Sequence, residues 1–201
     1  MCIRDSYKGY KNGRWIELKG EDAKAIKNDN ESTVSDVVPF ASADTAKIST
    51  SLDVIQGFDA VFPDAARTER MTIKYGRFIN DLDISGARRV MVLRDTQAAL
   101  LFGNDSTALG KTVSSMGLAW TVVGIYTHRW NRTTYAPYTA YKAVTGNNDD
   151  AYQLNVTVQG LTDEASGEAA EDDIRASLAR QHEFAPDDAN AIWTWNRFND
   201  Y

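Results

Sequence analysis

The sequence of residues 103–112 is similar to that of a phosphate-binding loop. These residues read Gly-Asn-Asp-Ser-Thr-Ala-Leu-Gly-Lys-Thr and end on the Gly-Lys-Thr that such loops share. A P-loop has four residues between its glycines and runs from a strand into a helix, because its backbone N–H groups must curl around the phosphates. Here six residues separate Gly103 from Gly110, and the pattern predicts a helix before the loop and a strand after it. We therefore expect a turn into a hairpin, with no ATP binding at Lys111.

Residues 81–86, Asp-Leu-Asp-Ile-Ser-Gly, begin like a calcium-binding loop. Oxygen-bearing side chains stand at the first, third and fifth positions, and glycine stands at the sixth, as such a loop requires. The twelfth position should be a bidentate Glu, but it is Val92, and the flanking residues have the patterns of strands. The sequence therefore predicts a polar turn whose Asp side chains bond to the local backbone.

Other residue types that support catalysis or metal binding are scattered. His128 and His182 are the only histidines, and neither belongs to a ligand-spaced cluster. The single cysteine, Cys2, excludes an internal disulfide and a cysteine-based zinc site. There is no Gly-x-Ser-x-Gly nucleophile motif, and the adjacent acid pairs cannot converge on one substrate bond. We expect no enzyme activity, and no catalytic, cofactor-binding or metal-binding residues.

One stretch, residues 127–142, has a composition suited to binding. It carries three basic residues with no acid among them, together with four large aromatics: Arg129, Arg132, Lys142, Trp130, Tyr135, Tyr138 and Tyr141. Arg, Trp and Tyr are enriched at protein interfaces, and aromatics beside basic groups can also stack on single-stranded bases. An edge strand and loop with amphipathic aromatics remains the structural alternative. The candidate interface residues are Arg129, Trp130, Arg132, Tyr135 and Tyr138.

Composition narrows the class of protein. The chain has 201 residues, of which 43% are hydrophobic and 25% charged, and its net charge is 22 − 28 = −6. These values are ordinary for a soluble globular protein, and an acidic chain lacks the basic footprint of a duplex-DNA binder. The longest apolar stretch, residues 118–126, is too short to span a membrane as a helix. Residues 1–6 have no apolar core of a signal peptide. They look like a translated sequencing adapter joined to a truncated reading frame, and we exclude them from fold reasoning.

The elements that must position these residues follow from periodicity. Helices are predicted from Gly20 onward, over residues 96–102 with Gly103 as the C-terminal cap, and over residues 169–182. Strands are predicted at residues 14–18, 34–40, 47–50, 53–58, 89–93, 111–115, 118–126, 152–158 and 191–195. Residues 135–141 are expected to be extended, and Pro137 indicates an edge strand there.

The order of these elements predicts an α+β fold with a discontinuous domain. Residues 7–75 and residues 150–201 each contain a β-α-β unit, and together they would form a porter-like, ferredoxin-like domain. Residues 76–149 would form an inserted β-rich lobe whose core includes Val90, Val92, Leu101, Phe102, Trp120 and Val122. One continuous domain is also compatible with this order.

An ordered set of short motifs resembles a known family. The motifs are Gly76-Arg77-Phe78-Ile79 with Asp83, Val90-Met91-Val92-Leu93, Leu101-Phe102-Gly103, Leu109-Gly110-Lys111-Thr112-Val113 and Trp120-Thr121-Val122-Val123-Gly124-Ile125. Together they resemble the extracytoplasmic core domain of MacB-like (FtsX-type) ABC transporter permeases, from about residue 7 to residue 201, especially the short permeases of Bacteroidetes-type bacteria. Arg94 departs from the pattern, because the family usually has a small residue there, and this puts the local backbone geometry in doubt.

The resemblance implies a non-catalytic domain on the extracytoplasmic face of the bacterial inner membrane, anchored by membrane helices outside this fragment. It implies partners as well: a second permease copy, a cytoplasmic ABC ATPase reached through the missing membrane parts, and a periplasmic accessory protein. No cofactor and no nucleic acid are implied. The expected role is to couple ATP-driven motion of the ATPase to export or mechanotransmission across the envelope. The alternative is a freestanding extracytoplasmic module that binds a ligand or protein.

Overall fold

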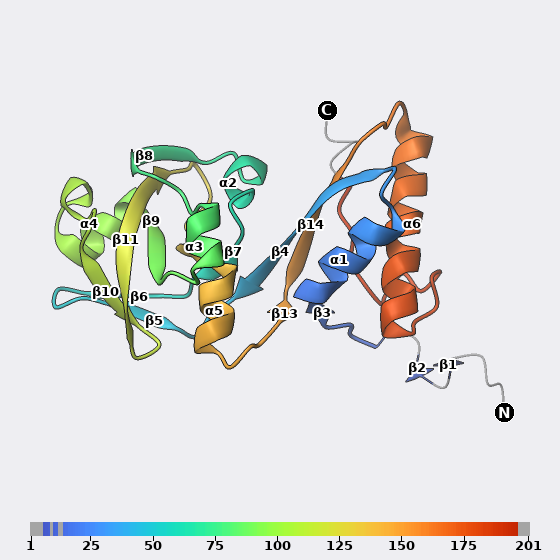
Figure 1. The fold of residues 1–201 in the computed structure, drawn as a ribbon, viewed down its shortest axis with the longest axis horizontal. Coiled ribbons are helices and arrows are strands. Elements are labelled where there is room, and N and C mark those ends of the chain that lie inside the picture. Colours follow the sequence, from blue (N-terminus) through green and yellow to red (C-terminus); the bar gives the residue numbers. More distant parts are fainter. Residues whose placement is uncertain (1–5, 9, 12–13, 197–201) are drawn as a thin grey trace. The chain divides into compact units, whose positions relative to one another are not determined.

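Two segments far apart in the sequence fold together in the computed structural model, which describes residues 6–8, 10–11 and 14–196 (Figure 1). Residues up to Val37 and from Leu154 onward form one compact unit, here called the outer unit. Val38–Gln153 form a second, the inserted unit. The sequence placed the start of the insertion at residue 76, whereas residues 38–75 pack within the inserted unit because their strands pair with its strands. Residues 1–5, which include Cys2, lie outside the described part.

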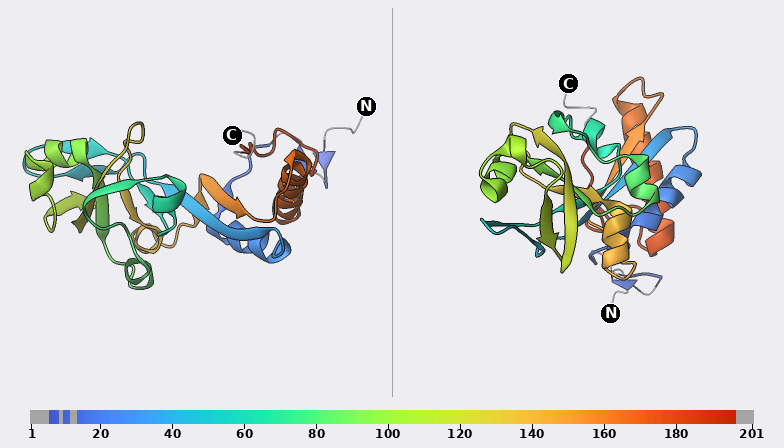
Figure 2. Two further views of the ribbon diagram at one scale, coloured as in Figure 1. Left: turned by 90° about the horizontal axis from the view of Figure 1, so that it is seen from above. Right: turned by 60° about the vertical axis from the view of Figure 1, so that its left-hand side comes forward.

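The outer unit is built from two helices and short strands. Its elements are β1 (Ser6–Tyr7), β2 (Tyr10–Lys11), β3 (Leu18–Lys19), α1 (Gly20–Asp29), the first half of β4 (Val34–Ser42), β14 (Gln153–Val158) and α6 (Glu164–His182). Helix α6 starts where the Asp163 side chain accepts a hydrogen bond from the Ser166 N–H at 2.8 Å, which satisfies one free donor of the first turn. Helix α1 lies against α6 (Figure 2). Between them the Asn30 side chain donates to the Ser177 hydroxyl at 3.0 Å.

An apolar core closes the outer unit. Ile26, Val34, Leu178 and Phe184 are buried together, and Ile174 packs against them. Apart from Phe184, which follows the end of α6, these positions combine one face of α1, one face of α6 and the inward side of β4, as helical and strand periodicity predicted.

Two predicted strands of the outer unit are largely absent. Of residues 14–18, only Leu18 belongs to a strand, and residues 191–195 form a turn and irregular backbone. The apolar alternation there is real, since Trp193 is exposed and Ile192 partly buried. The segment is bound by side chains instead of a strand ladder: Arg175 of α6 donates to the Asp188 carbonyl and to the Thr194 hydroxyl, each at 3.4 Å.

The inserted unit is a mixed sheet with short helices. Its elements after β4 are β5 (Lys47–Ser49), β6 (Val54–Gln56), β7 (Asp59–Val61), α2 (Ala65–Thr68), β8 (Thr72–Gly76), α3 (Asp81–Ser85), β9 (Val90–Arg94), α4 (Asp95–Phe102), the 3₁₀ turn η1 (Asp105–Thr107), β10 (Thr112–Ser115), β11 (Leu118–Thr127), β12 (Tyr135–Pro137), α5 (Tyr138–Val144) and β13 (Asp150–Ala151). The strand order is β4-β7-β12-β9-β11-β10-β5-β6, with β8 also paired to β11. The pairs β9–β11 and β7–β12 are parallel and the neighbouring pairs antiparallel, so the fold class is α+β.

Strand β11 is the centre of this sheet, because it pairs with β8, β9 and β10. The predicted β10–β11 hairpin is confirmed, with Ser115 opposite Leu118. Its turn residues Met116 and Gly117 have φ of 52° and 73°, the left-handed pair that a two-residue hairpin turn needs. Helix α4 is also as predicted, and Gly103 caps it in the left-handed conformation at φ 80°.

The prediction for residues 135–141 was wrong in two respects. The extended segment ends at Pro137, and α5 begins at the next residue. Strand β12 is not at an edge, because it lies between β7 and β9. Pro137 is tolerated there because β9 pairs with β12 only at Tyr135, and because a missing N–H suits the start of a helix.

The inserted unit has its own core. Leu101, Trp120 and Val122 share one cluster with Phe102 packed against it, and Val92 belongs to an adjoining cluster. Neither cluster includes Ile174 or Leu178 of the outer unit. Five of the six core residues named from the sequence therefore lie in or against clusters made only of inserted-unit residues, whereas Val90 is buried but belongs to neither cluster.

Candidate functional site

Residues 128–134 connect β11 to β12, and the exposed part of this loop presents three of the five predicted interface residues. Trp130 is 75% exposed, and Arg129 and Arg132 are exposed beside it. The Arg129 guanidinium lies 4.9 Å from the centre of the Trp130 ring, a cation–π contact that holds the two side chains together. The loop therefore offers one flat aromatic surface with positive charge around it.

The loop is held from within by His128 and Asn131. His128 Nδ1 accepts hydrogen bonds from the backbone N–H groups of Trp130, at 3.2 Å, and Asn131, at 2.8 Å. The Asn131 Oδ1 atom accepts from the Thr133 N–H at 2.9 Å, and its amide donates to the Tyr135 hydroxyl. These bonds fix the backbone under Trp130, so His128 has a structural role.

The loop is also held from the β9–α4 junction. Arg94 donates to the His128 carbonyl at 3.1 Å, and Gln97 donates to the Arg132 carbonyl at 2.8 Å. The Thr134 hydroxyl donates in turn to the Gln97 side chain at 3.1 Å. Arg94 itself has ordinary extended backbone, with φ −69° and ψ 149°, so the unusual residue does not distort the strand end. It instead ties the strand end to the loop.

Two predicted interface residues lie in the core. Tyr135 is 1% exposed and packs against Tyr126, and Tyr138 is 3% exposed and stacks on Phe62 with ring centres 5.1 Å apart. Burial raises the pKa of both hydroxyls. The candidate surface is therefore Arg129, Trp130 and Arg132, which we call the Arg-Trp loop.

Sequence reasoning missed the residues that position the loop. Arg94 and Gln97 stand more than thirty residues away in the chain, and nothing near them in the sequence points to residues 128–132. His128 was considered only as a metal ligand. The local signal in the sequence is His128 itself, which stands two and three residues before the backbone N–H groups that it accepts from.

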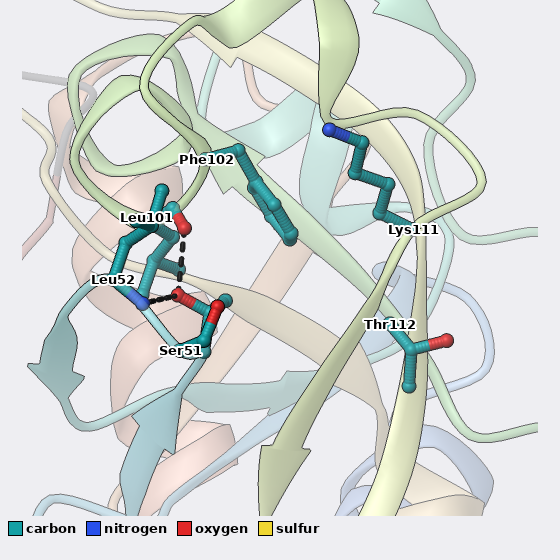
Figure 3. A pocket seen from close by; sticks show the side chains of 7 residues that line it. Ser51, Leu52, Leu101, Phe102, Lys111 and Thr112 are labelled. Atoms are coloured by element: carbon teal, nitrogen blue, oxygen red, sulfur yellow. Dashed lines mark hydrogen bonds between the residues drawn. The ribbon is translucent and has the colours of Figure 1, made fainter.

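The near-miss phosphate motif forms the hairpin entry that the sequence predicted. The N–H of Gly110 donates to the Val122 carbonyl at 2.8 Å, and that of Lys111 donates to the Ala108 carbonyl at 3.1 Å. Both amides are therefore engaged within the protein. The Lys111 ammonium lies 5.3 Å from the centre of the Phe102 ring, beside a depression of about 410 Å³ that the β5–β6 turn also lines (Figure 3).

The calcium-like motif is a helix start and not a polar turn. Asn80 caps α3 by accepting from the Asp83 N–H at 3.1 Å, and the Asp83 carboxylate accepts from the Asn80 N–H at 3.0 Å. Asp83 is fully buried and binds the Arg77 guanidinium at 2.5 and 3.1 Å. Burial alone would raise the pKa of Asp83, but Arg77 and the backbone donor outweigh it and hold that pKa below its usual value. The carboxylate is fully engaged in structure.

Two glycines place Arg77 against the sheet. At Gly76, φ is +72°, and a Cβ atom there would lie 2.3 Å from the Val123 carbonyl oxygen. At Gly124, a Cβ atom would lie 2.0 Å from the Arg77 carbonyl oxygen. Both positions therefore require glycine, which explains physically why the Gly76-Arg77 and Val123-Gly124 motifs occur together.

The remaining titratable candidates are also structural. His182 Nε2 lies 2.8 Å from the buried Asp22 carboxylate, which also accepts from the Lys19 N–H at 2.7 Å. Within the described residues, no three His, Cys, Asp or Glu side chains gather as a metal site. None of the helices that the structure describes is long and apolar enough to cross a membrane.

The family described as "MacB-like periplasmic core domain" matches residues 4–177. The chain belongs to this family. The MacB-like domain is a non-catalytic, extracytoplasmic part of an ABC-type permease, and permeases of this type act with ABC ATPases. No curated protein matches the chain significantly.

Solved structures share the fold. The periplasmic region of MacB from Actinobacillus actinomycetemcomitans is 19% identical with a TM-score of 0.71, over 84% of this chain and 76% of that one. The extracellular domain of the noncanonic ABC-type transporter YknZ from Gram-positive bacteria is 18% identical with a TM-score of 0.72, over 85% and 87%. A domain of a putative permease protein from Porphyromonas gingivalis is 16% identical with a TM-score of 0.58, over 83% and 71%. The MacB-like domain thus has the α+β architecture of these periplasmic and extracellular domains.

Proposed function

We propose that this MacB-like domain couples ATP-driven motion of a partner ATPase to export or mechanotransmission across the cell envelope, and that it contacts a partner protein through the Arg-Trp loop. Family membership supports the first part. The loop carries the second, because it combines an exposed tryptophan with two arginines on a braced backbone. In this proposal the outer unit is the porter-like domain and the inserted unit is its β-rich lobe.

The composition of the loop suits a protein interface. Trp and Arg are the residues most enriched among those that dominate binding energy. The domain as a whole has a net charge of −6, so two copies repel each other unless a local basic patch offsets that charge. Arg129 and Arg132 supply such a patch, and they favour an acidic surface on the partner.

The bracing of the loop lowers the cost of binding. A loop that must be ordered on association loses conformational entropy, which weakens the complex. Here His128 holds the turn from within, while Arg94 of β9 and Gln97 of α4 hold its two ends. The Trp130 ring is therefore presented in one orientation, and most of its contact energy remains available for binding.

The partner in this proposal is a second permease copy or a periplasmic accessory protein. The test is Trp130→Ala in the full-length permease, with crosslinking from a cysteine placed at Thr127, the exposed last residue of β11 beside the loop, and with transport as the second readout. We expect both the crosslink and transport to fall sharply. Trp15→Ala is the matched control, because Trp15 is 86% exposed in the outer unit and lies outside the loop.

Gln97→Ala should weaken the crosslink less than Trp130→Ala, since it loosens the loop without removing its contact surface. Unchanged crosslinking and unchanged transport in Trp130→Ala would refute the interface. A loss in Trp15→Ala equal to that in Trp130→Ala would show that the effect is not specific to the loop.

A further inference from the structure

A second cavity of the inserted unit lies away from the Arg-Trp loop and has the makeup of a small-molecule site. Its volume is about 580 Å³, within the usual range for pockets that hold small ligands. The turn between α3 and β9 forms one side of it, the start of β11 another, and α5 a third. Thr139 of α5 donates to the Ile84 carbonyl of α3 at 2.6 Å, so two of these walls are joined.

The charge in this cavity is positive and only partly neutralised. Arg88 and Arg89 line it side by side. Arg88 lies 4.0 Å from the Asp83 carboxylate, but Arg77 already occupies both oxygens of that carboxylate. Arg89 makes no ion pair with any residue in the described part of the chain. Two exposed guanidinium groups are therefore available to an anion.

The opposite walls are apolar. Leu118 at the start of β11 and Ala140, Ala143 and Val144 of α5 line the cavity. Small side chains on α5 leave space beside the helix, and Leu118 and Val144 supply partly exposed apolar surface. A ligand that matches both halves has an anionic group at one end and a short apolar group at the other.

We propose that this cavity binds small amphiphilic carboxylates. The carboxylate lies between Arg88 and Arg89, whose planar forks match its two oxygens, and the apolar group lies on Leu118 and the face of α5. A fatty acid and the C-terminus of a peptide with an apolar last residue share this chemistry. The inference concerns a ligand of the isolated domain, so it stands or falls separately from the proposed role of the Arg-Trp loop.

The test uses the 201-residue chain and two defined probes. Octanoate represents the fatty acid, and acetyl-Ala-Leu represents the peptide C-terminus. Titration calorimetry gives the affinity, and chemical shift changes in a ¹⁵N- and methyl-labelled sample give the location. We expect saturable millimolar binding of at least one probe, with shift changes at Leu118, Ala140 and Ala143. Which probe binds more tightly identifies the source of the carboxylate.

Arg88→Ala and Arg89→Ala should each weaken binding about tenfold or more, since each removes a hydrogen bond between charged groups. Gly86→Ala changes packing without changing charge, because its methyl group would lie 3.1 Å from the Leu82 carbonyl oxygen and 3.3 Å from Arg88 Cγ, so these neighbours must shift slightly. We expect a smaller loss of affinity for Gly86→Ala than for the arginine variants. Lys111→Ala is the matched control, as it removes a cation from the other depression, shown in Figure 3.

Three results would overturn the proposal. One is the absence of saturable binding by both probes. Another is equal binding of acetyl-Ala-Leu and its neutral C-terminal amide, which would show that the carboxylate is not recognised. The third is loss of binding in Lys111→Ala with full binding in both arginine variants, which would place the probes in the other depression.

Discussion

Replacing Asp83 by Asn should destabilise the inserted unit by about 3 kcal/mol. The side chain is fully buried and accepts two hydrogen bonds from Arg77, at 2.5 and 3.1 Å. A hydrogen bond to a charged group is worth about 1.5–3 kcal/mol. The lower end applies here, because the Arg77 side chain is 42% exposed and can be rehydrated when its partner is lost. Asn also keeps an acceptor for the Asn80 N–H, so the cap of α3 survives.

Urea unfolding followed by tryptophan fluorescence can measure this change. Trp120 is the fully buried tryptophan of the inserted unit, and the other four are exposed by more than half. The short-wavelength part of the emission therefore comes from Trp120, and its shift to longer wavelength on unfolding reports on the core around that residue. The variant should unfold at lower urea with an unchanged slope, because the surface exposed on unfolding stays the same.

The matched control is Asp81→Asn, two residues away. Asp81 is exposed in the same first turn of α3, so both substitutions weaken the helix dipole interaction alike. We expect a loss of about 0.5 kcal/mol for the control. If Asp83→Asn costs no more than Asp81→Asn, the buried pair does not stabilise the fold and this reasoning is wrong.

The same pair gives a pH dependence of defined sign. The pKa of Asp83 is lowered in the folded state, so the native state releases this proton more readily than the unfolded chain does. The contribution is present above the unfolded pKa of about 3.9 and is lost as pH falls through the folded pKa. The stability difference between the parent chain and Asp83→Asn should therefore shrink in acid.

Two further changes test other parts of the inserted unit. Burial raises the pKa of Asp59 to about 6, although Tyr152 donates to it at 2.9 Å, so the free energy of unfolding should fall as pH rises from about 4 to 6. In urea unfolding, Asp59→Asn should be more stable than the parent at pH 7 by up to about 3 kcal/mol, with no gain at pH 4. Gly124→Ala should lower the free energy of unfolding by about 3 kcal/mol through overpacking, since its Cβ would lie 2.0 Å from the Arg77 carbonyl oxygen. A urea midpoint equal to that of the parent would contradict this, because it would mean that the backbone around Gly124 can move apart without a loss of stability.

The sequence predicted elements well where local periodicity and caps agreed. Helix α4 with Gly103, the β10–β11 hairpin and β14 all follow from residues within one turn or one strand of each other. Helix α6 was found but begins earlier than expected, at Glu164, because its start depends on the Asp163–Ser166 cap and not on apolar spacing.

The sequence predictions were wrong where the local structure depends on contacts with residues far away in the chain. Residues 135–141 have strand-forming side chains, yet α5 begins at Tyr138, and the Tyr138 ring is buried against Phe62, which is far away in the sequence. The same cause removed Tyr135 from the candidate surface, since its burial depends on Tyr126 and Phe78. The exposed Trp130 was predictable from its basic, acid-free neighbours, whereas its support from Gln97 was not.

The outer unit takes its residues from both ends of the chain, up to Val37 and from Leu154 onward, and this fixes an order of events during synthesis. The ribosome releases α1 and the first half of β4 long before α6 exists. Until then Ile26 and Val34 have no helix to cover them, while all residues of the inserted unit have already been made and can complete their cores. Domains generally fold as units as they emerge, so the inserted unit can fold first.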